Sequence, residues 1–155
     1  MPVLDIRIAG PRRNGPTTSV ARGRTALRAA AAFFALGFCV GTFTHLRDTL
    51  ELGLFGYRSV PQVVNIFWTC LLAVDPLTAA LLFIAPAAGL IAGSAVMVAD
   101  IGINLWIILR EYALSGRLDI LYFAFQLPFG VAILLYTTTM LHRRRLQTRQ
   151  VHPSS

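Results

Sequence analysis

The sequence contains no lysine, and long stretches of it carry no charge of either sign. Charged residues make up 14% of the chain, whereas soluble domains carry about a quarter. Hydrophobic residues reach 55%. This composition excludes an ordinary soluble domain and indicates a one-domain integral membrane protein. All 14 basic residues are arginine, a bias that we attribute to a GC-rich bacterial genome.

Cysteine is scarce, since the chain has only Cys39 and Cys70, and both fall within apolar segments. A structural disulfide is therefore not expected, and no cluster of cysteine and histidine predicts a metal site. The sequence also lacks a recognisable pair of nucleophile and base. These gaps argue against an enzyme and leave any cofactor unassigned.

The apolar runs predict an all-α fold, an integral membrane four-helix bundle. A helix needs about 20 residues, within about 17 to 25, to cross the hydrocarbon core. Residues 60–109 form one long run whose only formal charges are two aspartates. At about 1.5 Å per residue, this run measures about 75 Å as a helix, which is enough for two crossings of about 30 Å. We expect a membrane domain at 25–142 with spans at about 29–46, 61–84, 87–109 and 120–141.

The long run is expected to turn back at residues 85–89, beside Pro86. Proline suits the first turn of a helix, where its missing N–H has no partner to lose. Choosing the charge-free stretch 76–99 as a single span would instead leave flanking segments too short to cross. A turn beside Pro86 places both Asp75 and Asp100 inside the membrane.

Three further features concern helix shape and packing, and two of them leave alternatives open. Asp75-Pro76 resembles a helix start, so the second span is either kinked or broken there, and broken helices often line transporter binding sites. Pro128, followed by Gly130, predicts a kink in the fourth span. The first span contains a Gly37-x-x-x-Gly41 spacing, which either brings two helices together or occurs by chance in a chain rich in glycine and alanine.

The first span also resembles a secretory signal peptide, because arginines precede it. We expect it to be retained, because no small-x-small cleavage site follows it and Phe38 precedes Cys39. The polar segment before it, residues 1–24, is expected to be a disordered basic tail in the cytoplasm. Residues 143–155 are expected to form a second basic tail on the same side.

Arginine asymmetry predicts the orientation. The two ends together carry ten arginines, whereas the first and third connections carry two each, accompanied by two acids each. The positive-inside rule places both ends in the cytoplasm, N-in/C-in, in a bacterial inner membrane. Because these arginines flank bilayer-length segments, we expect them to bind anionic lipid headgroups, and we do not expect a nucleic-acid partner.

Polar residues of the two middle spans fall on matching faces. Asp100 and Asn104 are one turn apart and can hydrogen-bond each other, on a stripe that also contains Gly89 and Gly93. This face should point into the bundle, because an aspartate facing lipid costs about 2.5 to 3.5 kcal/mol. Counted from the turn, Asp75 and Asp100 lie about 14 Å and about 20 Å into the membrane. We predict a shared polar pocket of Asn65, Thr69, Asp75, Asp100 and Asn104, with Gln126 as the next candidate.

Two buried carboxylates without a cationic partner should not both carry charge. Ionisable residues inside a membrane are functional candidates, and the pocket would bind a small molecule or relay protons. The alternative is an accessory or assembly protein, a homo-oligomer or the partner of another membrane protein, whose buried polar groups only specify helix packing.

A second cluster lies at the outer end of the first span. His45, Asp48 and Glu51 are spaced by three residues, and Arg47 precedes Glu51 by four. Imidazole and carboxylates can bind a metal, but one histidine with two acids is a weak signal. A solvated collar of ion pairs is the favoured interpretation.

Overall fold

The computed structural model describes residues 16–115 and 121–151, with the side chains of residues 21–115 and 123–146. The described residues form four helices and no strand, which confirms the predicted all-helical fold. The helices are α1 (Pro16–Leu52), α2 (Gln62–Ile84), α3 (Pro86–Ser115) and α4 (Leu121–Val151). All four contain a segment long and apolar enough to cross a membrane, as expected for a multi-pass membrane protein. These segments are Ala21–Leu52, Gln62–Ile84, Pro86–Ser115 and Phe123–Leu146.

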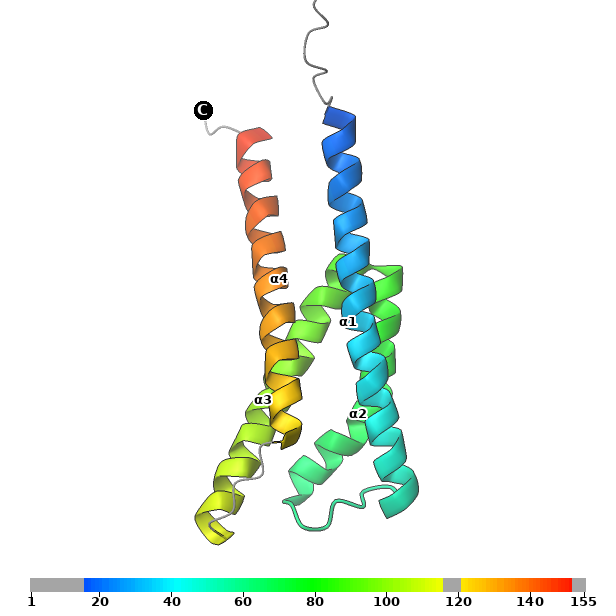
Figure 1. Cartoon of the computed structure of the whole chain (residues 1–155), viewed down its shortest axis with the longest axis vertical. Helices are drawn as coiled ribbons and strands as arrows, with labels where there is room; N and C mark the ends of the chain where they lie inside the picture. The colour runs from blue at the N-terminus through cyan, green and yellow to red at the C-terminus, as the bar shows by residue number, and fades with distance from the viewer. Residues whose placement is uncertain (1–15, 116–120, 152–155) are drawn as a thin grey trace, which may run out of the picture.

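The helices form an elongated bundle in which α1 packs mainly on α2, and α3 packs on both α2 and α4 (Figure 1). The start of α1 and the end of α4 lie at one end of the bundle and extend beyond the turn between α2 and α3, which is directed toward the same end. We call this end the terminal side. The connection between α1 and α2, residues 53–61, lies at the opposite end, which we call the loop side.

The first and last helices are longer than the spans that we expected. α1 begins at Pro16, so residues 16–24, which we expected to be disordered, are helical. α4 continues to Val151 through most of the expected second tail. Alanine and arginine both favour helix, and a helix that already crosses the bundle extends easily because its nucleation is complete. The rest of the first tail, residues 1–15, lies outside the described residues.

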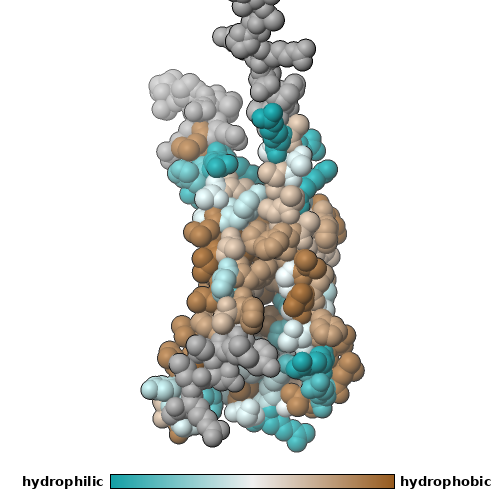
Figure 2. Space-filling view, viewed as in Figure 1, coloured by the Kyte–Doolittle hydropathy of each residue, from teal (hydrophilic) through white to brown (hydrophobic). Residues whose placement is uncertain are grey.

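The surface carries a broad hydrophobic band between two hydrophilic ends (Figure 2). Phe33, Leu36 and Phe125 are each more than 60% exposed on the outside of the helices. Such a band would be unfavourable in water but matches the hydrocarbon core of a bilayer. Exposed arginines lie on the extensions of α1 and α4 at the terminal side: Arg22, Arg24, Arg28, Arg143, Arg144 and Arg145.

A single residue, Ala85, separates α2 from α3. The Ala85 N–H donates to the Leu81 carbonyl at 2.8 Å, and the Gly89 N–H donates to the Ala85 carbonyl at 2.9 Å. Gly89 lies against the backbone of α2, because a Cβ atom there would be 2.6 Å from the Leu82 Cα. The tight turn therefore holds α2 and α3 in close antiparallel contact.

The hydrophobic core occupies the part of the bundle nearest this turn. The rings of Phe34 and Phe38 on α1 meet Phe129 of α4 edge to face, with centroids 5.8 and 5.7 Å apart. Both acids lie further along their helices toward the loop side. The core residues are Ala31, Phe34, Ala35, Phe38, Ala79, Leu82, Leu90, Met97 and Ile133.

Neither interior proline ends its helix. α2 is continuous from Gln62 to Ile84 with Pro76 inside it, so the alternative of a broken second span is wrong. α4 is likewise continuous through Pro128. Proline removes one backbone hydrogen bond, which a helix packed against its neighbours tolerates.

Candidate functional site

Three polar side chains join α3 to α4 in one hydrogen-bonded cluster. The Asn104 Nδ2 donates to Asp100 Oδ1 at 2.9 Å and to Gln126 Oε1 at 3.1 Å. The Gln126 Nε2 donates to Asp100 Oδ2. The bond predicted between Asp100 and Asn104 is therefore present, and Gln126 completes the cluster from α4. Both carboxylate oxygens of Asp100 are occupied by amide donors.

Asp75 on α2 is not part of these hydrogen bonds. Its side chain is buried, with 5% of the residue exposed, and it interacts electrostatically with Asp100. Its Oδ2 atom lies directly against Gly41 of α1, where a Cβ atom would collide with it. Within the described part of the chain, the Asp75 carboxyl makes no hydrogen bond.

No basic side chain among residues 21–115 and 123–146 forms an ion pair with either acid. The ion pairs in these ranges join Arg47 to Asp48 and Glu51, and Arg110 to Glu111, all toward the loop side. Asp75 and Asp100 therefore interact electrostatically without a basic partner in these ranges, and amide donors support Asp100 alone. The matched depths in the sequence predicted that the two acids lie close together.

Asn65 and Thr69, which we grouped with the acids, have partners elsewhere. The Asn65 Nδ2 donates to the Phe55 carbonyl at 2.7 Å, and its Oδ1 accepts from the Tyr57 N–H at 3.3 Å. The Thr69 hydroxyl donates to the Asn65 carbonyl at 2.8 Å. Asn65 therefore holds the 53–61 connection, in which Phe55 has a φ of 56° and Gly53 a φ of 84°. No hydrogen bond links Asn65 or Thr69 to the Asp100 cluster in the described residues.

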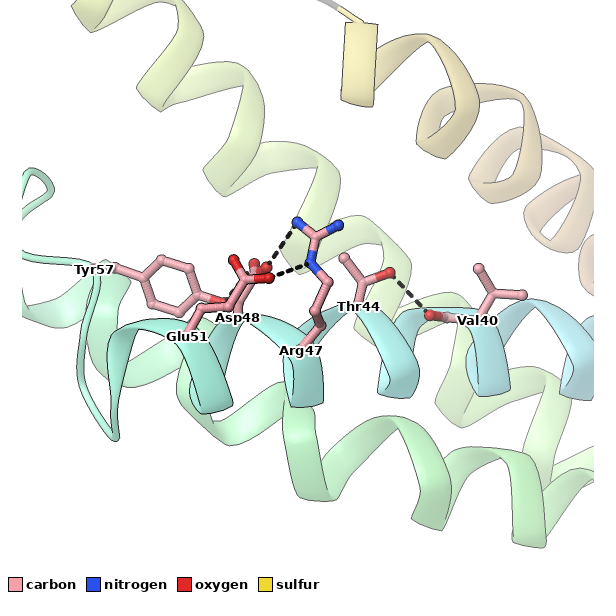
Figure 3. Close-up of polar contacts among 6 residues, drawn as sticks. All are labelled: Val40, Thr44, Arg47, Asp48, Glu51 and Tyr57. Carbon is pink, nitrogen blue, oxygen red and sulfur yellow. Dashed lines mark hydrogen bonds and ion pairs between the residues drawn. The ribbon is translucent and has the colours of Figure 1, made fainter.

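The acids of the second predicted cluster form the collar of ion pairs at the loop side (Figure 3). Arg47 reaches Asp48 at 3.3 Å and Glu51 at 3.5 Å. The Tyr57 hydroxyl donates to the other Asp48 oxygen at 3.1 Å. Burial, together with the charge of Asp48 and this hydrogen bond, raises the pKa of Tyr57 above its ordinary range. Among the described residues, no group of three potential ligands is arranged to hold a metal ion.

His45 differs from the other members of that cluster. Its Nδ1 atom is shielded from solvent and has no hydrogen-bond partner within the ranges that the structure describes. The sequence placed His45 with the collar because its spacing to Asp48 is three residues. In the described residues, the partly buried imidazole forms no ion pair with the carboxylates that Arg47 binds, although Asp48 interacts with it electrostatically.

Sequence reasoning missed a buried hydroxyl pair between α3 and α4. The Ser94 Oγ donates to Thr137 Oγ1 at 3.0 Å, and the Thr137 hydroxyl donates to the Leu90 carbonyl at 3.3 Å. Thr137 is the first of three consecutive threonines, and no local signal marks it as the inward-facing one. Thr138 and Thr139 are exposed and bond only to their own helix.

No family model, curated protein or solved structure matches this chain. The chemistry of the site is therefore argued from its own groups. Two carboxyl groups that interact electrostatically can exchange a proton with water or with each other.

Proposed function

We propose that this chain is an N-in/C-in protein of a bacterial inner membrane in which the pair Asp75 and Asp100 takes up and releases a proton. One observation carries the proposal, namely that Asp75 is buried, interacts electrostatically with a second carboxyl and makes no hydrogen bond in the described part of the chain. A carboxyl group inside a membrane that is neither paired nor used to join helices has no evident structural role.

Electrostatics supports a shared proton. Two unpaired carboxylates a short distance apart in a medium of low polarity repel each other strongly, and each also loses its hydration. Asp100 accepts two amide hydrogen bonds, which stabilise its charged form, whereas Asp75 has no such donor among the described residues. The proton therefore favours Asp75, and Asp100 is the fixed negative partner that holds it.

Close packing favours a proton over a larger ligand. Gly41 leaves no space beside the Asp75 Oδ2 even for a methyl group. Both oxygens of Asp100 already have donors from Asn104 and Gln126, which a larger ligand would have to displace. A proton needs neither room nor rearrangement of these amides.

The proposed orientation rests on the arginines at the terminal side. Arg22, Arg24 and Arg28 on α1, like Arg143 and its two neighbours on α4, are exposed on helix extensions beyond the α2–α3 turn. Positive residues at this end favour the cytoplasmic face and attract anionic headgroups. The loop side then faces the periplasm.

The experiment is infrared difference spectroscopy of the full chain in liposomes after a pH step. We expect a protonated carboxyl band at the high frequency of a group without hydrogen bonds, and loss of this band in Asp75→Asn. Asp100→Asn should shift it, because Asp75 loses its charged neighbour. Glu111→Gln, which changes an exposed acid on α3, is the matched control and should leave the band unchanged. A wild-type spectrum with no such band would refute the proposal.

A second candidate is an assembly role, favoured by the hydroxyl pair of Ser94 and Thr137 and by the amide cluster, which both tie α3 to α4. Under this alternative, Asp75→Asn would be silent in the membrane. Bulky residues at Gly93, where a Cβ atom would lie 2.9 Å from both Phe38 and Ile133, would instead be the damaging changes.

A further inference from the structure

The inward face of α1 leads from the hydrophobic core to the collar at the loop side. Phe38 is 2% exposed, and Gly41 contacts the Asp75 carboxyl. His45 follows Phe38 by seven residues, which is nearly two full turns, so both side chains leave α1 in almost the same direction. The His45 imidazole therefore points toward the interior between the helices, about 6 Å along α1 from the residue that touches Asp75.

The orphaned nitrogen of His45 needs an explanation. A buried polar atom without a partner costs about 1 to 3 kcal/mol, and packing alone does not require histidine at this position. Its Nδ1 has no hydrogen-bond partner in the described part of the chain. Imidazole is also the side chain best suited to pass protons near neutral pH, because its two nitrogens can accept and release a proton on opposite edges.

On the side toward water, His45 is close to Asp48, which interacts with it electrostatically. Asp48 retains 23% side-chain exposure and contacts Arg47 and Tyr57 (Figure 3). Glu51 completes the charged groups on this part of α1 through its pair with Arg47. From the loop side inward, the titratable groups are therefore first Asp48, then His45, and then the pair of Asp75 and Asp100.

On the terminal side, the same interior is closed. Phe34, Leu82 and Leu90 are between 0 and 4% exposed and fill the space between the acids and the turn. The buried hydroxyls in this part of the bundle, such as those of Thr78 and Ser94, do not ionise and are already hydrogen-bonded. Among the described buried residues of this core, none carries a carboxyl or an imidazole, the groups that exchange protons most readily near neutral pH.

We propose that protons reach the Asp75–Asp100 pair from the loop side alone, and that His45 carries them. This inference rests on the proposed function of the pair. The imidazole takes a proton from the Asp48 side on one nitrogen and releases a proton from the other nitrogen to the Asp75 carboxylate. A water molecule that enters only during the transfer bridges the remaining gap. A neutral imidazole and a protonated carboxyl result, and no bond between heavy atoms changes.

The first test measures how fast the Asp75 carboxyl band appears after a pH step on the loop side of oriented liposomes. His45→Gln keeps a polar side chain but does not titrate in this range. We expect this variant to slow the appearance of the band by about a hundredfold, because a positioned proton-transfer group typically accelerates a reaction on this scale. The final amplitude of the band should not change. Added imidazole should restore the rate. His142→Gln, at an exposed histidine on α4, is the matched control and should have no effect.

The second test measures the side of access in a chain with Cys39→Ala and Cys70→Ala. Single cysteines at His45 and Leu82 are each exposed to a small charged thiol reagent from one side at a time. We expect His45→Cys to react from the loop side only, and Leu82→Cys from neither side.

The outcomes separate the two proposals. A missing wild-type band refutes the proton site itself. A normal band that appears at the same rate in His45→Gln refutes the role of His45 alone. Reaction of His45→Cys from the terminal side, or from both sides, refutes one-sided access.

Discussion

Gly41 on α1 lies against the carboxyl group of Asp75 on α2, so closely that any side chain at position 41 would overlap the Oδ2 atom. Its spacing partner Gly37 meets the ring of Phe129 on α4 in the same way. The two glycines thus serve contacts with two different helices. The Gly-x-x-x-Gly spacing is therefore a packing feature of this bundle and not a chance occurrence.

Gly41→Ala should destabilise the protein and disturb Asp75. The added methyl group has to displace either α1 or the carboxyl, and overpacking of this kind costs about 1 to 3 kcal/mol. Unfolding in mixed detergent micelles measures the loss in the free energy of unfolding.

Gly102→Ala is the matched control, because its Cβ would meet nothing within 4 Å. There, the better helix propensity of alanine should stabilise α3 by up to about 1 kcal/mol. Equal effects of the two changes would contradict the close contact.

Gly89→Ala should be at least as damaging as Gly41→Ala. An alanine Cβ at position 89 would lie 2.6 Å from backbone atoms of Leu82 in the last turn of α2. This backbone cannot move aside as a side chain can, because a single residue joins α2 to α3. We expect a loss of about 3 kcal/mol, the upper end of the overpacking range. The free energy of unfolding in the same micelles checks this, and a loss below that of Gly41→Ala would show that the turn adapts.

Ser94 and Thr137 should be energetically coupled. A double-mutant cycle with Ser94→Ala and Thr137→Val removes each hydroxyl alone and both together. Measured hydrogen bonds between membrane helices average about 0.6 kcal/mol and reach about 1.7 kcal/mol, so we expect a coupling within this range. The neighbouring change Thr138→Val, at an exposed hydroxyl bonded to its own helix, should show no coupling to Ser94.

Alkaline pH should lower the free energy of unfolding, because it favours the ionised form of Tyr57 at the loop side. Its pKa is raised by burial and by Asp48, so the folded protein keeps the phenol proton at a pH where unfolded tyrosine releases it. The unfolded state then binds fewer protons, and stability falls as the pH rises above the ordinary tyrosine value of about 10. Below that pH the contribution is fully present.

The absorbance of tyrosinate measures this titration, with Tyr57→Phe identifying the band among the four tyrosines of the chain. Asp48→Asn should lower the pKa of Tyr57 toward its ordinary range, because it removes the neighbouring charge. No change in the titration of Tyr57 in this variant would contradict the contact.

The fold was largely predictable because the bilayer restricts the choices. A run as long as residues 60–109 can be buried in lipid only as two helices, and Pro86 is the residue best suited to begin the second. The structure places Ala85 between α2 and α3, within the predicted turn. The continuity of α2 through Pro76 was not predictable, because Asp75-Pro76 reads equally well as a helix start.

The site was predictable only in part. Helical periodicity placed Asp100 and Asn104 on one face, and the depth count brought Asp75 level with them. The same count misassigned Asn65, because it ignored the 53–61 connection that folds back onto the start of α2 and takes both ends of the Asn65 amide. A helical projection contains no information about such loops.

The sequence by itself determined that four helices are long and apolar enough to cross a membrane and that two aspartates fall within these helices, since hydropathy, helix rise and bilayer thickness leave little freedom. Only the tertiary structure decided which groups meet those aspartates. It placed amides on Asp100, glycine on Asp75, and on the same helix as that glycine an imidazole whose Nδ1 has no partner among the described residues. The physical reason is that insertion into a membrane depends on hydrophobicity summed over many residues. A contact between two side chains depends instead on how each helix is rotated and packed against its neighbours.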